Sequence, residues 1–191
     1  MGVGVLTPAV ATEYNITGIL LRSTGLAHDV RLNTHETYAS YSQLYLTSYT
    51  STNGDCYDRY LLRIAEIFES LSVANQTLIK LVKANGFLKK QFTSNQNRVY
   101  RNMESLIKHF KYWSEGLTIN TNITTASVES PKGEFSVTLV SNNTNKPERV
   151  RVKSPAYYNT QLAKQLAKGH LLADLVTIIG TIDIVFGEVD R

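Results

Sequence analysis

The stretch that decides the fold is the last one, GHLLADLVTIIGTIDIVFGEVDR, residues 169–191. It is strongly apolar and stands at a terminus, where residues usually fray unless they are tied down. Asp174 and Asp183 interrupt it, and an ionised carboxylate in apolar surroundings is costly unless it is paired, hydrogen-bonded or neutralised. We therefore expect this end to be buried against its own chain or against a partner.

The same stretch does not have the form of a membrane span. A spanning helix needs roughly 20 mostly apolar residues, whereas the apolar run here is shorter and contains two aspartates and a glycine. The pattern predicts instead a buried helix from about His170 to Ile179, ended at Gly180 and followed by an extended tail.

Composition places narrow bounds on function. The chain has 191 residues, enough for one domain or one large piece of a domain, and its net charge of +4 is only mildly basic. That charge is far below the dense basic stripe of a dedicated nucleic-acid binder. The single cysteine, Cys56, excludes an intrachain disulfide and any cysteine-rich metal cluster held by this chain alone. The histidines are scattered, so we expect no metal site: His28, His35, His109 and His170.

Inward from the terminus, the sequence predicts two long helices. Asp55 is a good N-cap for a helix from Tyr57 to about Lys83, which should stop near residues 85–86. Residues 87–97 are predicted to be a polar connector. A second helix should cover residues 98–114 and end at Gly116. Each helix has apolar residues at helical spacing along one face.

Beyond residue 118 the apolar period changes from helical to alternating. Alternation over residues 119–125, 135–139 and 150–152, with turns at 130–133 and 142–147, predicts a small antiparallel β-meander. A short helix from Asn159 to Lys168, ended by Gly169, then leads into the terminal stretch. The expected fold class is α+β, mainly helical, with the whole of 1–191 forming a single piece.

Motifs for catalysis are not found. There is no glycine-rich phosphate loop or nucleophile elbow, and Cys56 has no nearby histidine, so we expect no catalytic residue in this chain. The charged motifs are expected to be structural ion pairs rather than catalytic groups, and their members are Asp29, Arg31, Asp55, Asp58 and Arg59. A basic stripe on the third predicted strand is interpreted as a solvated face, with RNA or phosphate binding left open: Arg149, Arg151 and Lys153.

Several blocks, read in order, resemble one family. They are LRSTGLAHDVR (21–31), GDCYDRYLLR (54–63), MESLIKHF (103–110), SPKGEF (130–135) and the terminal GHLLAD to GEVDR block (169–191). Together they resemble the hydrogenase-like large subunit, of the forty-nine-kilodalton type, in the quinone-reducing module of respiratory complex I, the NADH:ubiquinone oxidoreductase. The resemblance departs from the family at His35-Glu36, where a Pro-Tyr pair is usual, and between Lys83 and Asn97.

The resemblance implies a fold and a set of partners. The fold would be the C-terminal part of one like that of the nickel–iron hydrogenase large subunit. The N-terminal half, which carries the quinone headgroup ligands in the family, is expected on a separate chain. Other expected partners are the iron–sulfur subunit of the quinone module, further complex I subunits and the membrane arm, with no nucleic acid. The expected location is peripheral, on the matrix side of the mitochondrial inner membrane or the corresponding bacterial membrane face.

The resemblance also implies a site. The terminal block would form part of the quinone-cavity wall, with Asp183, Val185, Phe186 and Arg191 as the carried-over residues. No cofactor would be bound by this chain, since the iron–sulfur cluster and NAD would be held by other subunits and quinone would lie at the interface. Two alternatives stay open: a subunit of a related ferredoxin- or hydrogen-linked membrane complex, and a basic structural or RNA-associated accessory protein.

Overall fold

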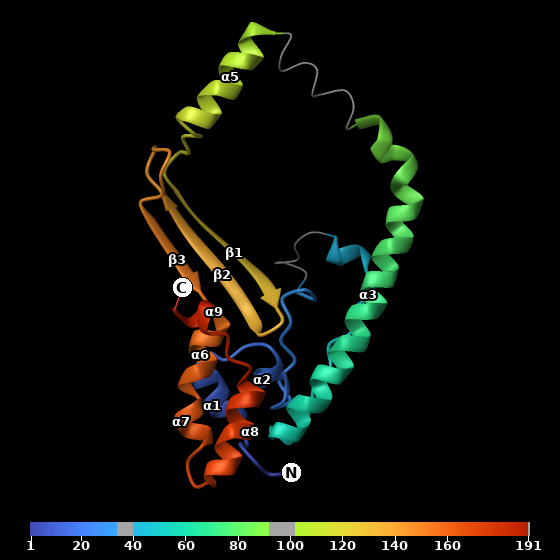
Figure 1. The fold of residues 1–191 in the computed structure, drawn as a ribbon, viewed down its shortest axis with the longest axis vertical. Helices are drawn as coiled ribbons and strands as arrows, with labels where there is room; N and C mark the ends of the chain where they lie inside the picture. Colours follow the sequence, from blue (N-terminus) through green and yellow to red (C-terminus); the bar gives the residue numbers. More distant parts are fainter. Residues whose placement is uncertain (34–39, 92–101, 191) are drawn as a thin grey trace. The chain divides into compact units, whose positions relative to one another are not determined.

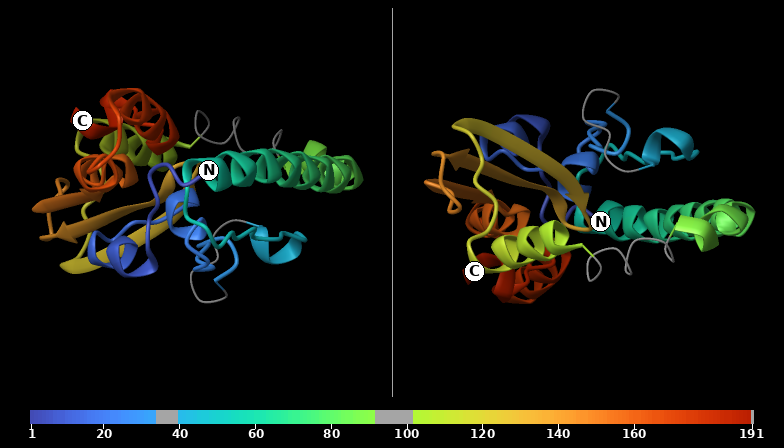
Figure 2. Two further views of the ribbon diagram at one scale, coloured as in Figure 1. Left: turned by 90° about the horizontal axis from the view of Figure 1, so that it is seen from below. Right: turned by 90° about the horizontal axis from the view of Figure 1, so that it is seen from above.

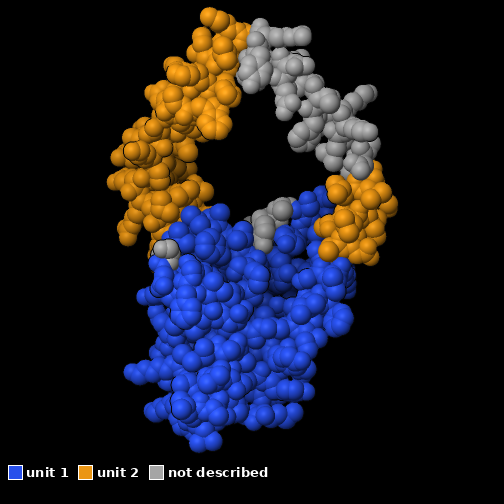
Figure 3. Space-filling model, viewed as in Figure 1, with its two compact units in different colours: residues 1–73, 126–137, 152–191 blue, residues 74–125, 138–151 orange. Residues whose placement is uncertain are grey.

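The computed structural model describes residues 1–33, 40–91 and 102–190 and contains helices and one sheet (Figures 1 and 2). The chain divides into two compact units (Figure 3). Unit 1 contains residues 1–73, 126–137 and 152–191, and unit 2 contains residues 74–125 and 138–151. The hydrophobic core lies in unit 1, so unit 1 positions the side chains that matter for function.

In unit 1 the two ends of the chain pack together (Figure 1). Two short N-terminal helices, α1 (Pro8–Glu13) and α2 (Ile19–Arg22), share one core with α6 (Pro155–Gln161), α7 (Ala163–Leu166) and α8 (Leu172–Ile182). Proline begins α1 and α6, where its missing N–H costs no intrahelical bond. The core side chains are Leu6, Ala11, Ile16, Leu20, Leu21, Cys56, Leu162, Leu166, Ile178 and Ile182.

A long helix, α3 (Cys56–Gln91), starts in unit 1 and continues into unit 2, and a 3-10 turn, η1 (Tyr41–Gln43), precedes it. The predicted N-cap is confirmed, because the Asp58 N–H donates to Asp55 Oδ1 at 2.8 Å. The predicted stop near residues 85–86 is wrong. Gly86 costs a helix interior only about 1 kcal/mol, and the helix continues to Gln91. The remainder of the predicted connector, residues 92–97, lies outside the described residues.

In unit 2, helix α5 (Met103–Ser114) begins after Asn102, whose side chain accepts a bond from the Glu104 N–H at 3.2 Å. Its predicted end is confirmed: Gly116 has φ of 81° and its N–H donates back to the Lys111 carbonyl. Residues 98–101, predicted as its first turn, are outside the described part. The apolar residues predicted to line one face are exposed: Met103, Ile107, Phe110 and Trp113.

The predicted meander is confirmed. Strands β1 (Asn122–Ser130), β2 (Gly133–Ser141) and β3 (Arg149–Lys153) form a three-stranded antiparallel sheet in the order β1-β2-β3 (Figure 1). The first strand begins later than expected and extends to Ser130, leaving only Pro131 and Lys132 in the turn. Helices together with this sheet confirm the α+β class.

The terminal stretch differs from its prediction in three ways. Helix α8 passes through Gly180 and ends at Ile182, and the tail that follows contains a second helix, α9 (Phe186–Asp190), rather than an extended strand. Burial is one-sided, since Ile178 and Ile182 lie in the core while many other apolar side chains of the stretch are exposed. None of the helices in the described part combines the length and apolar character that crossing a bilayer requires.

Candidate functional site

Asp183 stands at the bend between α8 and α9 and caps the C-terminal end of α8. It adopts φ 56° and ψ 58°, the left-handed region, which non-glycine residues rarely enter and which aspartate tolerates better than most. Gly180 was expected to end this helix, but the end is set by Asp183 instead. A residue held in this conformation must be fixed by its surroundings, and such residues gather at functional positions.

Lys132 provides that fixation. Its Nζ lies 2.9 Å from Asp183 Oδ2 and donates to the Asp183 backbone carbonyl at 2.5 Å. The same ammonium therefore neutralises the side chain and satisfies a carbonyl at a helix end, where no intrahelical partner exists. The lysine side chain is 15% exposed and the aspartate side chain 54%, so the carboxylate keeps an open side.

The turn that carries Lys132 is inserted tightly against the loop before α2. A Cβ built on Gly133, which has φ of 138°, would lie 2.6 Å from Thr17 Oγ1 and 2.9 Å from the Thr17 carbonyl oxygen. The Glu134 N–H donates to Thr17 Oγ1 at 2.9 Å. Gly18 meets the same turn from the other side, because its Cβ would lie 2.6 Å from Gly133 Cα. Only glycine at both positions permits this approach.

On the other strand of the hairpin, Glu129 belongs to a buried charge cluster centred on Arg22. The Arg22 guanidinium is 2% exposed and reaches Glu129 Oε1 at 2.9 Å and Glu66 Oε1 at 2.7 Å. It also donates to the His28 carbonyl at 3.0 Å. One arginine thus joins α2, α3, the loop after α2 and β1.

Burial and pairing act oppositely on the carboxyl groups of this cluster. Burial raises the pKa of Glu129, and the hydrogen bond and charge of Arg22 do not fully offset it. Burial also acts to raise the pKa of Asp29, but the hydrogen bonds and charge of Arg31 outweigh it and lower that pKa. Burial lowers the pKa of Arg22, yet the charges of Glu66 and Glu129 leave it raised overall, so the guanidinium stays charged.

The charged residues singled out in the sequence fall into two groups. Arg31 and Asp29 are in direct contact, with Nη2 and Oδ2 2.6 Å apart. Arg59, expected to pair with Asp55 and Asp58, is instead fully buried and donates to the Gly54 carbonyl at 2.7 Å and the Gly4 carbonyl at 2.9 Å. Helix geometry explains the difference, because Arg59 points along the start of α3 toward the N-terminal loop, where unpaired carbonyls await a donor.

Two further acidic groups serve local structure. Asp58 accepts from the Ser51 hydroxyl and, at 2.9 Å, from the Asn53 N–H, so it holds the loop before α3. Asp174 accepts from the Leu171 N–H at 3.2 Å and lies 3.8 Å from His170 Nδ1. The carboxylate that interrupts the first half of the terminal stretch is therefore an N-terminal cap of α8.

The expected quinone-wall residues lie together on the C-terminal segment. Val185 and Phe186 follow Asp183 closely and are 46% and 75% exposed. Arg191 lies outside the described residues. Leu171, Leu172 and Val176, at the start of α8 and along it, are exposed as well. Unit 1 therefore presents an apolar surface with one half-exposed carboxylate, and nothing in the described part of the chain covers it.

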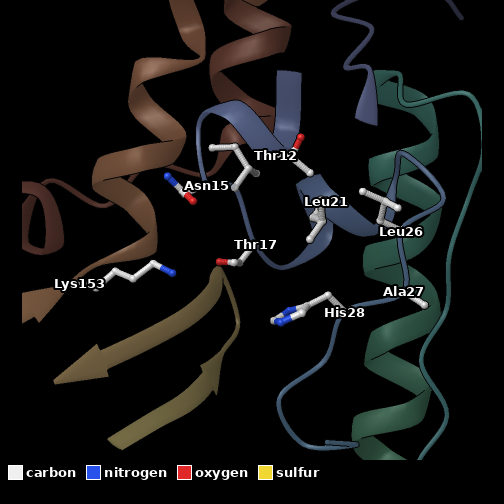
Figure 4. Close-up of a pocket in the computed structure, with 9 residues that line it drawn as sticks. Thr12, Asn15, Thr17, Leu21, Leu26, Ala27, His28 and Lys153 are labelled. Atoms are coloured by element: carbon white, nitrogen blue, oxygen red, sulfur yellow. The ribbon is translucent and has the colours of Figure 1, made fainter. Parts of the chain in front are cut away.

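A separate cavity of about 460 Å³ lies elsewhere in unit 1 (Figure 4). Figure 4 shows Thr17 between Lys153 and His28 at this cavity. Lys153 is committed to Glu134 at 3.2 Å, so the cavity offers no free ammonium. Asp183, Val185 and Phe186 do not line it. Within the described residues, no cluster of three or more His, Cys, Asp or Glu has the arrangement of a metal site.

Sequence reasoning missed Arg22, Glu66, Glu129 and Lys132 as members of the site. The block SPKGEF was interpreted as a turn, and its lysine as a turn residue. A partial signal was present, because Lys132 stands in a two-residue turn directly before a glycine, which marks a tight hairpin end. The distant partners Arg22 and Asp183 carry no signal in local spacing.

Comparison with known proteins covers the whole chain. Residues 1–191 match the family described as the 49 kDa subunit of respiratory-chain NADH dehydrogenase. The NADH-ubiquinone oxidoreductase 49 kDa subunit of Paramecium tetraurelia is 46% identical over 100% of this chain and 50% of its own length. The corresponding protein of Acanthamoeba castellanii is 45% identical, over 99% of this chain and 47% of its own length.

A bacterial relative matches the same region. The NADH-quinone oxidoreductase homologue of Orientia tsutsugamushi (strain Boryong) is 40% identical over 99% of this chain and 48% of its own length. The chain therefore spans about half the length of the curated relatives it matches.

Proposed function

Since the chain belongs to the family of the 49 kDa subunit of respiratory-chain NADH dehydrogenase, we propose that it works as part of a proton-pumping NADH:quinone oxidoreductase. The observation that carries this proposal is the match over all of residues 1–191. Because the relatives are about twice as long, the chain would contribute a portion of the subunit and no complete active site. The relatives' names favour this complex over a ferredoxin- or hydrogen-linked one.

The proposed contribution is part of the quinone-cavity wall. Val185 and Phe186 supply exposed apolar surface, which suits a quinone ring and its isoprenoid tail. Asp183 adds a carboxylate at the edge of that surface, where it can accept a hydrogen bond or pass a proton. Lys132 holds the carboxylate in place through two contacts, so its position does not depend on the ligand. Arg191 is part of the same proposal.

Electron carriers would be held by other subunits. This chain offers no cysteine cluster, since Cys56 is its single cysteine and lies buried in the core. We propose that the exposed apolar surface of α8 and α9 packs beside an iron–sulfur subunit, with NAD bound further away in the complex. The assembly would place the chain peripherally at the matrix face of the mitochondrial inner membrane or the equivalent bacterial face. The fold would be the C-terminal part of a hydrogenase-like large subunit.

Asp183→Asn tests the proposed site. Asparagine tolerates the left-handed backbone and keeps the side-chain size, so the change removes the charge and leaves the bend intact. In the purified complex we expect quinone-dependent NADH oxidation to fall about tenfold or more, which corresponds to about 1.4 kcal/mol of activation free energy. Electron transfer to an artificial acceptor such as ferricyanide should be unchanged.

Two controls complete the experiment. Asp174→Asn alters the other carboxylate of the same stretch, which caps α8, and should leave the quinone rate close to normal if the variant assembles. Equal quinone rates in the wild type and Asp183→Asn would remove Asp183 from the site. Recovery of the chain only as a free monomer, never with iron–sulfur partners, would contradict the proposed function as a whole.

A further inference from the structure

The first part of α3 has its polar side turned inward. On the side toward the rest of unit 1 lie Asp58, Arg59 and Leu62, which are 6%, 0% and 5% exposed. Glu66 lies on that side as well and pairs with Arg22. Three of these four groups are charged. Helices on globular proteins normally bury their apolar stripe and expose their charges.

The opposite side of the same segment carries a continuous apolar row, which we call the outer stripe: Tyr57, Leu61, Ile64, Phe68 and Leu71. These residues recur at spacings of three and four, and at about 3.6 residues per turn they fall within roughly a quarter of the circumference. Phe68 and Leu71 are 68% and 62% exposed, and Ile67 beside them is 58% exposed. An apolar row of this length on a surface marks a contact with another protein segment.

The helix cannot rotate to bury the outer stripe. Arg59 is held by the carbonyls of Gly54 and Gly4, and Glu66 is held by Arg22 at 2.7 Å. Turning the stripe inward would break these contacts and leave buried charges without partners, which costs several kcal/mol. The cover for the stripe must therefore come from outside the described chain.

We infer that the outer stripe is the seat of an apolar α-helix from the remaining half of the 49 kDa subunit. The relatives contain about as much sequence again outside the region that this chain matches, so the family supplies a segment of the required size. The row has no charged member, so its occupant must be apolar. Rows at three- and four-residue spacing are the ridges that pack into the grooves of another helix. The inference deepens the proposed function and depends on it for the identity of the occupant.

Photo-crosslinking in the assembled protein tests this directly. Phe68 is replaced by p-benzoylphenylalanine, the complex is purified in mild detergent and irradiated, and the crosslinked peptides are identified by mass spectrometry. We expect crosslinks to an apolar helical segment of the remaining half of the subunit. The same replacement at Val150, which is 51% exposed on β3, is the matched control and should not give those crosslinks.

A second measurement uses a charge in the stripe. Phe68→Asp should lower the yield of the chain recovered with a co-expressed remaining half by more than about tenfold, since an interface carboxylate would be buried without a partner. Val150→Asp should leave the yield unchanged. Both side chains are exposed in this chain, so neither change should prevent its folding.

The outcomes separate the inference from the proposed function. Crosslinks from position 68 to a second copy of this chain, to lipid or to a different subunit would overturn the inference while leaving the chain in the complex. Undiminished pairing of Phe68→Asp would overturn it as well. Absence of the chain from the complex would contradict the proposed function, and the co-expressed pair would still decide the inference.

Discussion

The β1–β2 hairpin end carries two ionic contacts of opposite character. At Glu129, two carboxylates and one guanidinium are enclosed together, with Arg22 2% and Glu129 3% exposed. At Lys132, three residues along the chain, a lysine meets a carboxylate that is 54% exposed. The enclosed contact fixes the hairpin to α2 and α3, while the open contact carries that fixed position to the bend of the C-terminal segment.

The difference separates stability from chemistry. An enclosed charge cluster tolerates no loss of a partner, whereas a half-open pair contributes little stability but presents a reactive carboxylate. Glycine contacts between the turn and the loop before α2 allow one hairpin end to do both. The following changes are ordered by the size of their expected effect on this contrast.

Arg22→Met is expected to have the largest effect. It leaves Glu66 and Glu129 without their buried cation, and removing one partner from such a pair costs about 3–5 kcal/mol. The denaturant midpoint of the subunit purified with its remaining half should fall accordingly. The triple variant Arg22→Met, Glu66→Gln, Glu129→Gln should recover much of the loss, because no carboxylate then remains uncompensated. Equal losses in the single and triple variants would contradict the pairing explanation.

Gly133→Ala should have the next largest effect. The new methyl group would lie 2.6 Å from Thr17 Oγ1 on a backbone with φ of 138°, so either the turn or the loop must move. We expect destabilisation of roughly 1–3 kcal/mol, measured by thermal unfolding, with a reduced quinone rate because Lys132 shifts. Gly180→Ala is the control: nothing lies within 4 Å of its Cβ, and alanine in a helix should stabilise by up to about 1 kcal/mol.

The Lys132–Asp183 pair should give a smaller effect. A double-mutant cycle with Lys132→Met and Asp183→Asn is expected to yield a coupling energy of about 0.5–1 kcal/mol, since one partner is half exposed. Lys132→Met alone should cost more than Asp183→Asn alone, because the lysine also serves the Asp183 carbonyl. A coupling of zero in unfolding experiments would show that the contact does not hold the bend.

The smallest effect concerns pH. Asp29 has a pKa lowered from 3.8 in the fold, so its contribution to stability is present above that value and is lost as pH falls through the folded pKa. Glu129 has a pKa raised from 4.5, so its contribution is present below that value and is lost as pH rises through the folded pKa. Unfolding free energy measured against pH should lose the first dependence in Asp29→Asn and the second in Glu129→Gln. Unaltered profiles in both variants would contradict these directions.

Local rules predicted much of the fold. The cap at Asp55, the end of α5 at Gly116 and the order of the β-meander all follow from short-range signals, and they are confirmed. The end of α8 was misplaced because Gly180 gave a local signal, whereas the bend at Asp183 depends on Lys132, which lies 51 residues away in the chain. Alternation and spacing contain no information about such a partner.

The site was less predictable than the fold. Resemblance indicated Asp183, Val185 and Phe186, but it did not indicate the lysine that orients Asp183 or the arginine that anchors the hairpin. The apolar faces of the two long helices were predicted from spacing alone, and the structure leaves them exposed. Sequence patterns show that a face is apolar, but they do not show whether its cover belongs to the same polypeptide.

The inward polar side of α3 has a consequence for the life of the protein in the cell. A newly made copy displays the outer stripe to every chaperone and protease it meets, and unassembled chains with such surfaces are triaged. Its abundance should therefore follow the supply of its companion segment rather than its own rate of synthesis. The orientation of a single helix would in this way set the stoichiometry of an assembly.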